Sequence, residues 1–288
     1  MQDLYLVLPD YINDTIDRYI KSMGEPVPVK RISLQKGTVS FVGDTHGALD
    51  VTAFAMSLEA NSDLICFVGD LVDRGKRQLF NLLYILEMAM ISHKVIVVRG
   101  NHESTLTNEV YGFIEELQGF DIIEEVYPHI LRLYGKLPYA LYLDSGIVAV
   151  HGGIPQNALD LQNWNNLPMD DLEPLNTTAF EIMWNDPREF VDGFIPGTRG
   201  EGTFFFGPDA YYRFAERNKV KLFVRAHEVK KQGFEYYFNR KLISIFSSRY
   251  HKGKAAILRV NVEFPDKHEI AIVPEPPPGE EWVQWPGP

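Results

Sequence analysis

The sequence predicts a single α/β domain in which two β-sheets pack together and helices lie outside them. In residues 38–98, short apolar runs alternate with helical stretches, which is the pattern of βαβ units and a parallel sheet. From residue 140 onward, short β-rich runs follow one another with turn signals between several of them, and we expect mostly antiparallel strands there. Because no linker rich in Pro, Gly or Ser separates the two halves, we expect one domain.

The first half of the chain predicts its elements in order. Residues 10–23 have the pattern of a short amphipathic helix, which Gly24 and Pro26 then end. Three apolar runs predict neighbouring parallel strands: residues 38–42, 64–68 and 94–98. Helical stretches lie between them, and the second carries leucines at i, i+3, i+4 and i+7, which gives it a face suited to covering a sheet.

The second half predicts five β-rich runs, and these are residues 140–150, 221–225, 233–238, 241–247 and 255–263. We divide the chain into an N-terminal helical segment and lead-in (residues 1–37), a catalytic domain (38–263), and a final strand with a Pro/Trp-rich tail (264–288). The tail contains a proline run followed by Trp282 and Trp285, and we expect it to be extended.

Composition and charge exclude several classes of protein. The 28 basic and 39 acidic residues give a net charge of 28 − 39 = −11, so we expect no broad basic surface for nucleic acid or anionic lipid. No apolar stretch approaches the length of a membrane span, and the N-terminus lacks the pattern of a signal peptide. The single cysteine, Cys66, lies in an apolar run and suits a reducing compartment. We therefore expect a cytoplasmic protein.

Polar side chains follow the ends of the predicted strands. Five clusters have this position: GDTHG (residues 43–47), GDLVDRG (69–75), GNHE (100–103), HGG (151–153) and RAHE (225–228). Because the carboxyl ends of neighbouring parallel strands lie along one edge of a sheet, we expect the first three clusters to converge. A lone Asp after a strand is more often a helix cap, but five such clusters in one chain favour a shared site.

The residue types in these clusters indicate metal and phosphate chemistry. Carboxylate, amide and imidazole donors without a thiolate suit Mn, Fe or Zn, and their number is enough for two ions. Two such cations hold the attacking and leaving oxygens of an in-line displacement at phosphorus, so we expect a phosphate-ester substrate. Arg74 and Arg199 are suited to bind phosphate oxygens. His102 remains for proton transfer, with Asp73 or Glu103 as the carboxylate that keeps it charged.

The five motifs, in this order, resemble the phosphoprotein phosphatase family of metal-dependent serine/threonine phosphatases, within the calcineurin-like metallophosphoesterase superfamily. The resemblance runs from about residue 38 to 260 and includes MWNDP (residues 183–187) and TRGEGTFFFG (198–207). It implies a β-sandwich flanked by helices (α/β/β/α). It also implies hydrolysis of phosphomonoesters by a hydroxide that bridges two metal ions, most simply Mn, with phosphorylated proteins as substrates and regulatory partners that the sequence does not name.

The resemblance also implies a role for each matching residue. One metal ion would be held by Asp44, His46 and Asp70, and the other by Asp70, Asn101, His151 and His227. His102, paired with Asp73, would be the general acid. The substrate phosphate would contact Arg74, Asn101, Arg199 and Tyr250.

The chain departs from the family pattern near its C-terminus. The family's loop usually reads Ser-Ala-Pro-Asn-Tyr-Cys, whereas residues 247–251 read SSRYH. Tyr250 is retained, but the Pro, Asn and Cys are absent, and the segment from His151 to Trp184 is short. We therefore expect a compact member of prokaryotic or archaeal type without regulatory extensions.

Two other functions stay open at this point. A symmetrical diadenosine-tetraphosphate hydrolase belongs to the same superfamily and shares the early motifs, although TRGEGTFFFG and RAHE favour the protein phosphatase. A catalytically inactive module that binds phosphoproteins would lack a ligand or an arginine, and none is missing from the sequence.

Overall fold

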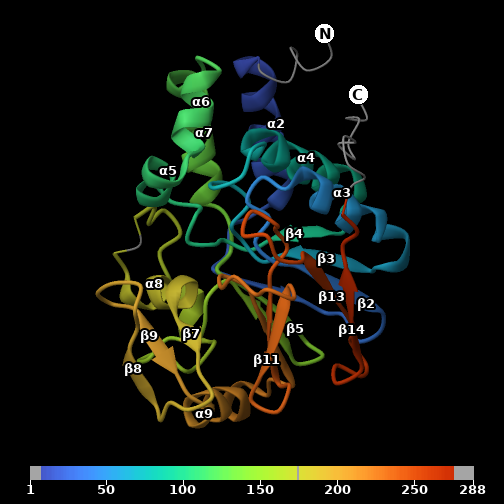
Figure 1. Ribbon diagram of the computed structural model, residues 1–288, viewed down its shortest axis with the longest axis vertical. Coiled ribbons are helices and arrows are strands. Elements are labelled where there is room, and N and C mark those ends of the chain that lie inside the picture. The colour runs from blue at the N-terminus through green and yellow to red at the C-terminus, as the bar shows by residue number, and fades with distance from the viewer. Residues whose placement is uncertain (1–7, 174, 276–288) are drawn as a thin grey trace.

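The computed structural model describes residues 8–173 and 175–275. Two β-sheets form its centre, and helices lie outside them (Figure 1). The five-stranded sheet has the order β14 (His268–Ile272), β13 (Ala256–Asn261), β2 (Thr38–Val42), β3 (Leu64–Phe67), β4 (Val95–Val97). The six-stranded sheet has the order β1 (Val29–Ile32), β5 (Ala140–Leu143), β6 (Ile147–Val150), β10 (Leu222–Arg225), β12 (Leu242–Ile245), β11 (Phe234–Tyr237). A small third sheet has the order β7 (Asp186–Pro187), β9 (Phe204–Phe206), β8 (Phe194–Pro196).

The two large sheets face each other across a shared apolar layer. Side chains alternate along a strand, so one set of β2 and β3 residues points into this layer, and Phe41 and Cys66 belong to it. Val224 and Ile243 enter the same layer from the six-stranded sheet. Burying both inner faces removes a large apolar area from water, which is the main force that holds the sandwich together.

Helices cover the outer faces of both sheets. The five-stranded sheet is covered mainly by helices from the first half of the chain: α2 (Pro9–Met23), α3 (Leu49–Ser57), α4 (Gln78–Ser92), α6 (Phe113–Gly119) and α7 (Ile123–Tyr134). The outer face of the six-stranded sheet packs against α8 (Thr177–Trp184), α9 (Pro208–Asn218) and the 3₁₀ turn η2 (Asn163–Asn166). Two further short elements are η1 (Glu59–Asn61) and α5 (Thr105–Tyr111). The predicted α/β/β/α layering is confirmed.

The pairing of the strands agrees with the sequence in the first half and differs from it in the second. β2, β3 and β4 are parallel neighbours, as the βαβ pattern predicts. The expectation of mostly antiparallel strands after residue 140 is wrong for β10, which pairs in parallel with both β6 and β12. Turn signals between short runs do not reveal that a chain crosses over and returns in the same direction.

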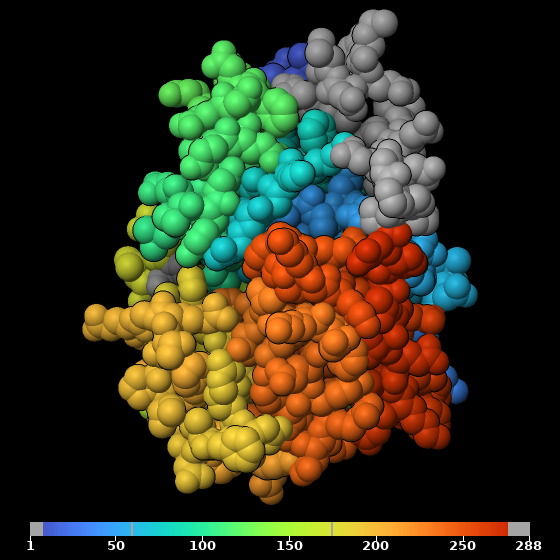
Figure 2. Space-filling model, viewed as in Figure 1, coloured from blue at the N-terminus to red at the C-terminus, as the bar shows by residue number. Residues whose placement is uncertain are grey.

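Among the described residues, two strands lie outside residues 38–263, the predicted catalytic domain. β1 lies within the predicted lead-in of residues 1–37 and pairs in parallel with β5, so this segment adds an edge strand to the six-stranded sheet. β14 pairs with β13, whereas the tail prediction for residues 276–288 falls outside the described residues. Figure 2 shows the segments around these late strands, in orange and red, covering much of one face of the molecule.

Within residues 8–173 and 175–275, no helix is long and apolar enough to cross a membrane.

Candidate active site

The carboxyl ends of strands from both large sheets meet at one edge of the sandwich. β2, β3 and β4 of one sheet, and β6 and β10 of the other, each lead into a polar loop at this edge. A parallel bridge between Asp44 and Phe246 joins the two sheets there. The loops bring together all seven residues that the sequence predicts as ligands or acid: Asp44, His46, Asp70, Asn101, His102, His151 and His227.

Tight backbone packing lets these loops approach one another. A Cβ atom on Gly69, whose φ is +91°, would lie 2.5 Å from the backbone nitrogen of Gly100, and one on Gly100 would lie 2.3 Å from Asp70 Oδ1. Both positions therefore require glycine. Five of the predicted site residues have left-handed φ angles, and these are His46, Asp70, Asp73, Arg74 and His227. Backbone strain of this kind is held by the surrounding structure and concentrates at functional sites.

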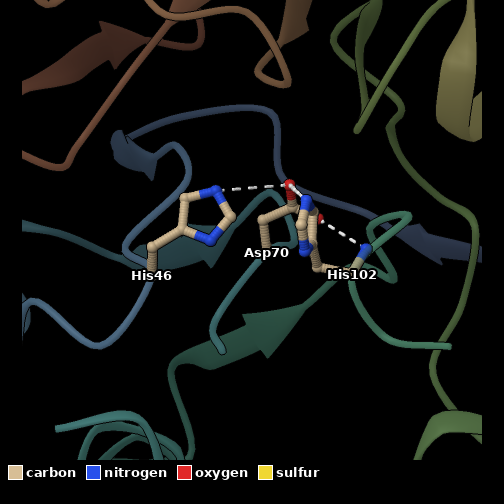
Figure 3. A group of neighbouring side chains, drawn as sticks. All are labelled: His46, Asp70 and His102. Carbon is tan, nitrogen blue, oxygen red and sulfur yellow. Dashed lines mark hydrogen bonds and ion pairs between the residues drawn. The ribbon is translucent and has the colours of Figure 1, made fainter. Parts of the chain in front are cut away.

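Asp70 occupies the centre of the cluster (Figure 3). Its Oδ1 accepts a hydrogen bond of 2.9 Å from the backbone N–H of His102, which fixes the carboxylate plane. Its Oδ2 then faces imidazole nitrogens on several sides, at 3.6 Å from His46 Nε2, 3.2 Å from His151 Nε2 and 3.9 Å from His102 Nε2. One carboxylate is thus shared between two groups of histidines, as a bridging ligand would be.

The imidazoles of His46 and His151 are oriented from behind by backbone carbonyls. His46 Nδ1 lies 2.7 Å from Val72 O, and His151 Nδ1 lies 2.7 Å from Val68 O. A carbonyl oxygen only accepts, so Nδ1 donates in both rings, and in a neutral ring the lone pair is then on Nε2. These Nε2 atoms face the Asp70 carboxylate, which also carries lone pairs. A cation between the imidazoles and the carboxylate would therefore be favourable.

The second group of donors lies between the two sheets. Asn101 Oδ1 lies 2.9 Å from His151 Nε2, and His227 Nδ1 lies 3.2 Å from the same atom. Asp44 joins this group because its Oδ1 accepts a 2.8 Å hydrogen bond from the backbone N–H of His227. His227 Nε2 is buried and has no hydrogen-bond partner, which is costly unless another group binds it.

Burial and mutual repulsion set the charges in the cluster. Burial, with the Asp70 charge added, raises the pKa of Asp44 to about 6. Burial also opposes ionisation of Asp70, but the surrounding imidazoles, that of His151 foremost, hold its pKa below the ordinary value. Burial lowers the pKa of His46 to about 3. Burial also opposes a charged His151, but the charge and hydrogen bond of Asp70, with the charge of Asp44 and the Val68 carbonyl, together outweigh it and raise the pKa of His151 to about 9. Positive charge is therefore favoured on the His151 side of Asp70, whereas the His46 ring is neutral.

The donor set fits divalent metal ions. Two groups of side chains could each hold an ion, because the ligand atoms within each group lie within 4.8 Å of one another. One group is His46, Asp70 and His102, and the other is Asp70, His151 and His227. All of these side chains are buried, and the donors are carboxylate oxygens and imidazole nitrogens, the types that Mn, Fe and Zn accept in proteins. The Nε2 lone pairs that His46 and His151 direct at Asp70 agree with this fit.

His102 forms a separate pair with a buried carboxylate. Its Nδ1 lies 2.7 Å from Asp73 Oδ2, and Asp73 is in turn held by the Asn108 side chain at 3.1 Å and the backbone N–H of Phe113 at 3.2 Å. Burial disfavours a charged His102, but Asp70 and Asp73 outweigh it and raise its pKa. Glu103, the other carboxylate that the sequence indicates for this role, is not the partner of His102. Its Oε2 accepts from the backbone N–H groups of Asp70 and Gly100, so it holds two loops together.

Arg74 and Tyr250 lie at the outer side of the cluster. Tyr250 is 40% exposed, and its ring meets that of His46 edge to face at 5.3 Å between centroids. The Arg74 guanidinium lies 5.8 Å from the centre of the Tyr250 ring and 4.1 Å from that of Tyr111. Tyr111, which the sequence analysis does not single out, therefore supports Arg74, and its ring also lies 5.0 Å from that of His102.

Arg199 reaches the site from the segment between β8 and β9. Its Nε donates a 2.7 Å hydrogen bond to Asp186 Oδ2, and its Nη2 lies 3.5 Å from the backbone oxygen of His227. Asp186 Oδ1 accepts from the fully buried Arg225 at 2.7 Å. Asp186 therefore fixes two arginines. The sequence indicated it only as part of the MWNDP motif, because nothing in the pattern shows which arginine it meets.

The comparisons with known proteins agree with this fold. Residues 37–231 match the family model of the calcineurin-like phosphoesterases. A segment of this length and the layered fold together show that the chain belongs to the calcineurin-like phosphoesterase family.

Individual relatives define the likeness further. The serine/threonine-protein phosphatase rdgC of Drosophila melanogaster is 35% identical over 84% of this chain and 40% of its own length. A protein phosphatase 2A catalytic subunit of Dictyostelium discoideum is 30% identical over 81% of this chain and 76% of its own. The chain thus spans less than half of the fly protein and about three quarters of the slime-mould protein.

Among solved structures, a protein serine/threonine phosphatase from Saccharomyces cerevisiae, described as similar to human phosphatase PP5, has the same fold. Its TM-score is 0.83 at 23% identity, and the match covers 94% of this chain and 92% of the yeast chain. The expectation of a prokaryotic or archaeal type is not supported, because these relatives are eukaryotic.

Proposed function

We propose that this chain is a metal-dependent protein serine/threonine phosphatase that hydrolyses phosphomonoesters. One observation carries the proposal. Asp70 sits between two groups of histidines, and Asp73 and Arg74 follow it in the same loop. His102, which pairs with Asp73, and Arg199 come from other loops at the same edge of the sandwich. A metal cluster, a proton donor and phosphate-binding groups at one place are the parts that phosphoester hydrolysis needs.

The proposed ligand sets are those that the sequence predicts. Asp44, His46 and Asp70 would hold one divalent ion, and Asp70, Asn101, His151 and His227 the other, with manganese as the proposed metal. Bound there, two divalent ions supply Lewis acidity toward phosphoryl oxygens and toward water. Every one of these residues is buried.

The other residues act on the phosphate and on the leaving group. Arg74 and Arg199 present guanidinium groups to the phosphoryl oxygens, with the Asn101 amide and the Tyr250 hydroxyl as further donors. His102 keeps its proton because Asp73 accepts from Nδ1, so Nε2 is the atom that donates to the departing serine or threonine oxygen. We propose no side chain of these clusters as a covalent nucleophile.

The names of the relatives support protein substrates. Both curated relatives are named as protein phosphatases or their catalytic subunits, and the match to the slime-mould protein covers 76% of that protein. We therefore propose phosphorylated proteins as partners in the reaction. A cytoplasmic location stays a prediction from the sequence.

The experiment uses protein stripped of metal with a chelator and then given Mn²⁺. Phosphate release is measured on matched phosphothreonine, phosphoserine and phosphotyrosine peptides and on diadenosine tetraphosphate, with the unsupplemented protein as the control. Faster turnover of the phosphothreonine or phosphoserine peptide supports the proposal. Faster turnover of the dinucleotide would replace the protein substrate by the diadenosine-tetraphosphate alternative, and binding of a phosphopeptide without turnover would favour the inactive module.

A further inference from the structure

Arg249 ties the loop that carries Tyr250 to two distant parts of the chain. Its Nη1 forms an ion pair with Asp50, in the first turn of α3. Its Nη2 donates to the backbone oxygen of Val273 at 3.2 Å and to that of Pro274 at 2.7 Å. One guanidinium thus joins the loop between β12 and β13, the start of α3, and the backbone that follows β14.

The partners of Arg249 are themselves fixed. Asp50 lies four positions after His46, at the start of a helix whose inner face is buried. Val273 is 4% exposed, and its N–H donates to Ala255 O at 2.9 Å. Pro274 follows Val273 directly, and its ring restricts its own φ. A flexible arginine held on three fixed acceptors loses most of its freedom and restrains its own backbone.

Tyr250 is the next residue, so the position of Arg249 limits where the Tyr250 ring can lie. The ring of Tyr250 rests on Phe246, at 5.8 Å between centroids, and on the edge of His46. The Arg74 guanidinium lies 5.8 Å from the centre of the same ring. The guanidinium of Arg249 is instead engaged by Asp50 and the backbone after β14.

We propose that Arg249 is a positioning residue, which holds Tyr250 over the site by tying its loop to the start of α3 and to the backbone after β14. The proposal rests on the proposed function in so far as Tyr250 contacts the substrate phosphate. It also assigns a role to the stretch SSRYH, where the sequence departs from the resembled family.

A double-mutant cycle separates this role from a general effect on stability. Arg249→Ala removes all three bonds, and Arg249→Lys keeps the charge without the fork of donors. The matched control is Arg259→Ala, because Arg259 also joins β14 to another element, through Glu269 of β14 and Asn61 O. Each substitution is made in the full chain with Tyr250 and with Tyr250→Ala, and thermal midpoints are recorded for all variants.

The kinetic readout is kcat and KM with p-nitrophenyl phosphate and Mn²⁺. We expect Arg249→Ala to raise KM about five- to tenfold when Tyr250 is present, less than about twofold in the Tyr250→Ala background, and Arg249→Lys to restore part of the loss. Arg259→Ala leaves KM unchanged. Equal effects of Arg249→Ala in both backgrounds would overturn the proposal, because Arg249 would then act independently of Tyr250.

Hydrogen exchange gives a readout that does not depend on activity. In Arg249→Ala we expect the amides of residues 247–253 to exchange at least about tenfold faster, while those of β2 and β3 and those of the Arg259→Ala protein keep their rates. Unchanged exchange in residues 247–253 contradicts the proposal whatever the enzyme hydrolyses. If the wild-type protein hydrolyses no phosphoester, the proposed function fails, and the exchange data still decide whether Arg249 fixes this loop.

Discussion

His102 Nδ1 and Asp73 Oδ2 lie 2.7 Å apart, and both side chains are almost fully buried. The other groups that bind the Asp73 carboxylate, the Asn108 amide and the backbone N–H of Phe113, carry no charge. The pair is therefore built to fix the orientation of the His102 ring and to favour its charged form, with Nε2 3.9 Å from Asp70 Oδ2.

The first prediction concerns this pair. Asp73→Asn keeps the shape of the side chain but removes the charge that favours protonated His102, so its pKa falls and proton donation weakens. We expect kcat for a phosphothreonine peptide to fall by about 10²–10⁴, with bound metal unchanged. Steady-state kinetics and metal analysis check this, with Asp144→Asn, an exposed residue directly after β5, as the control. An unchanged kcat in Asp73→Asn would mean that His102 is not the general acid.

The second prediction concerns the shared carboxylate. Asp70→Asn removes the negative charge on which the imidazoles of both groups converge, so both proposed metal sites lose a ligand at once. We expect metal affinity to fall by at least about a hundredfold and turnover to be lost at micromolar Mn²⁺. Atomic emission analysis after dialysis measures the bound metal. His102→Asn is the matched comparison and should keep its metal, so loss of metal in both variants would mean that His102 is a ligand.

The third prediction separates the charge of Arg74 from its support. Arg74→Lys keeps the charge but cannot bind two phosphoryl oxygens in parallel, so we expect KM to rise at least about tenfold. Tyr111→Leu removes the ring that lies 4.1 Å from the guanidinium, a contact worth about 0.5–1 kcal/mol at an exposed site, or roughly two- to fivefold in KM.

Phosphopeptide kinetics check both variants, with Arg217→Lys on the exposed face of α9 as the control. A larger effect for Tyr111→Leu than for Arg74→Lys would show that Tyr111 contacts the substrate itself rather than the arginine.

The sequence predicts the parts of the site that strand ends create. Asp44, Asp70 and Asn101 follow neighbouring parallel strands, and the regular spacing of βαβ units is enough to bring them to one edge of the sheet. His151 and His227 follow strands of the other sheet, and only the motif order assigned them to the same site. Local pattern does not show how two sheets face each other.

The sequence predicts the side chains that support the site less well than it predicts the ligands. Tyr111 supports Arg74 from the end of α5, and no pattern in the sequence relates a tyrosine 37 positions later to that arginine. The expectation of mostly antiparallel strands failed at β10 for a similar reason, because parallel pairing joins segments that are far apart in the chain. Long-range pairing depends on the summed packing of the whole sandwich rather than on the residues of one strand.

The last prediction concerns Asp186 and the stability of the fold at acidic pH. Asp186 is almost fully buried between Arg225 and Arg199, and these charges outweigh burial and lower its pKa below the ordinary value of 3.8. A carboxylate with a lowered pKa stabilises the folded state above its unfolded pKa, and this contribution is lost as the pH falls through the folded pKa. Asp186→Asn removes the charge beside the buried Arg225, so we expect the free energy of unfolding at pH 7 to fall by about 3 kcal/mol.

Urea unfolding between pH 7 and pH 3 measures this difference. The gap between the wild type and Asp186→Asn should be constant from pH 7 to about pH 5 and should narrow below 3.8, because only the wild-type carboxyl group becomes protonated there. Asp209→Asn, which breaks an exposed pair with Arg213, should cost less than about 1 kcal/mol. The same Asp186 variant releases Arg199, so KM for the phosphopeptide should rise as well. A gap that persists unchanged at pH 3 would mean that Asp186 stabilises the fold through hydrogen bonds that the amide also makes, and that its charge is not what holds the two arginines.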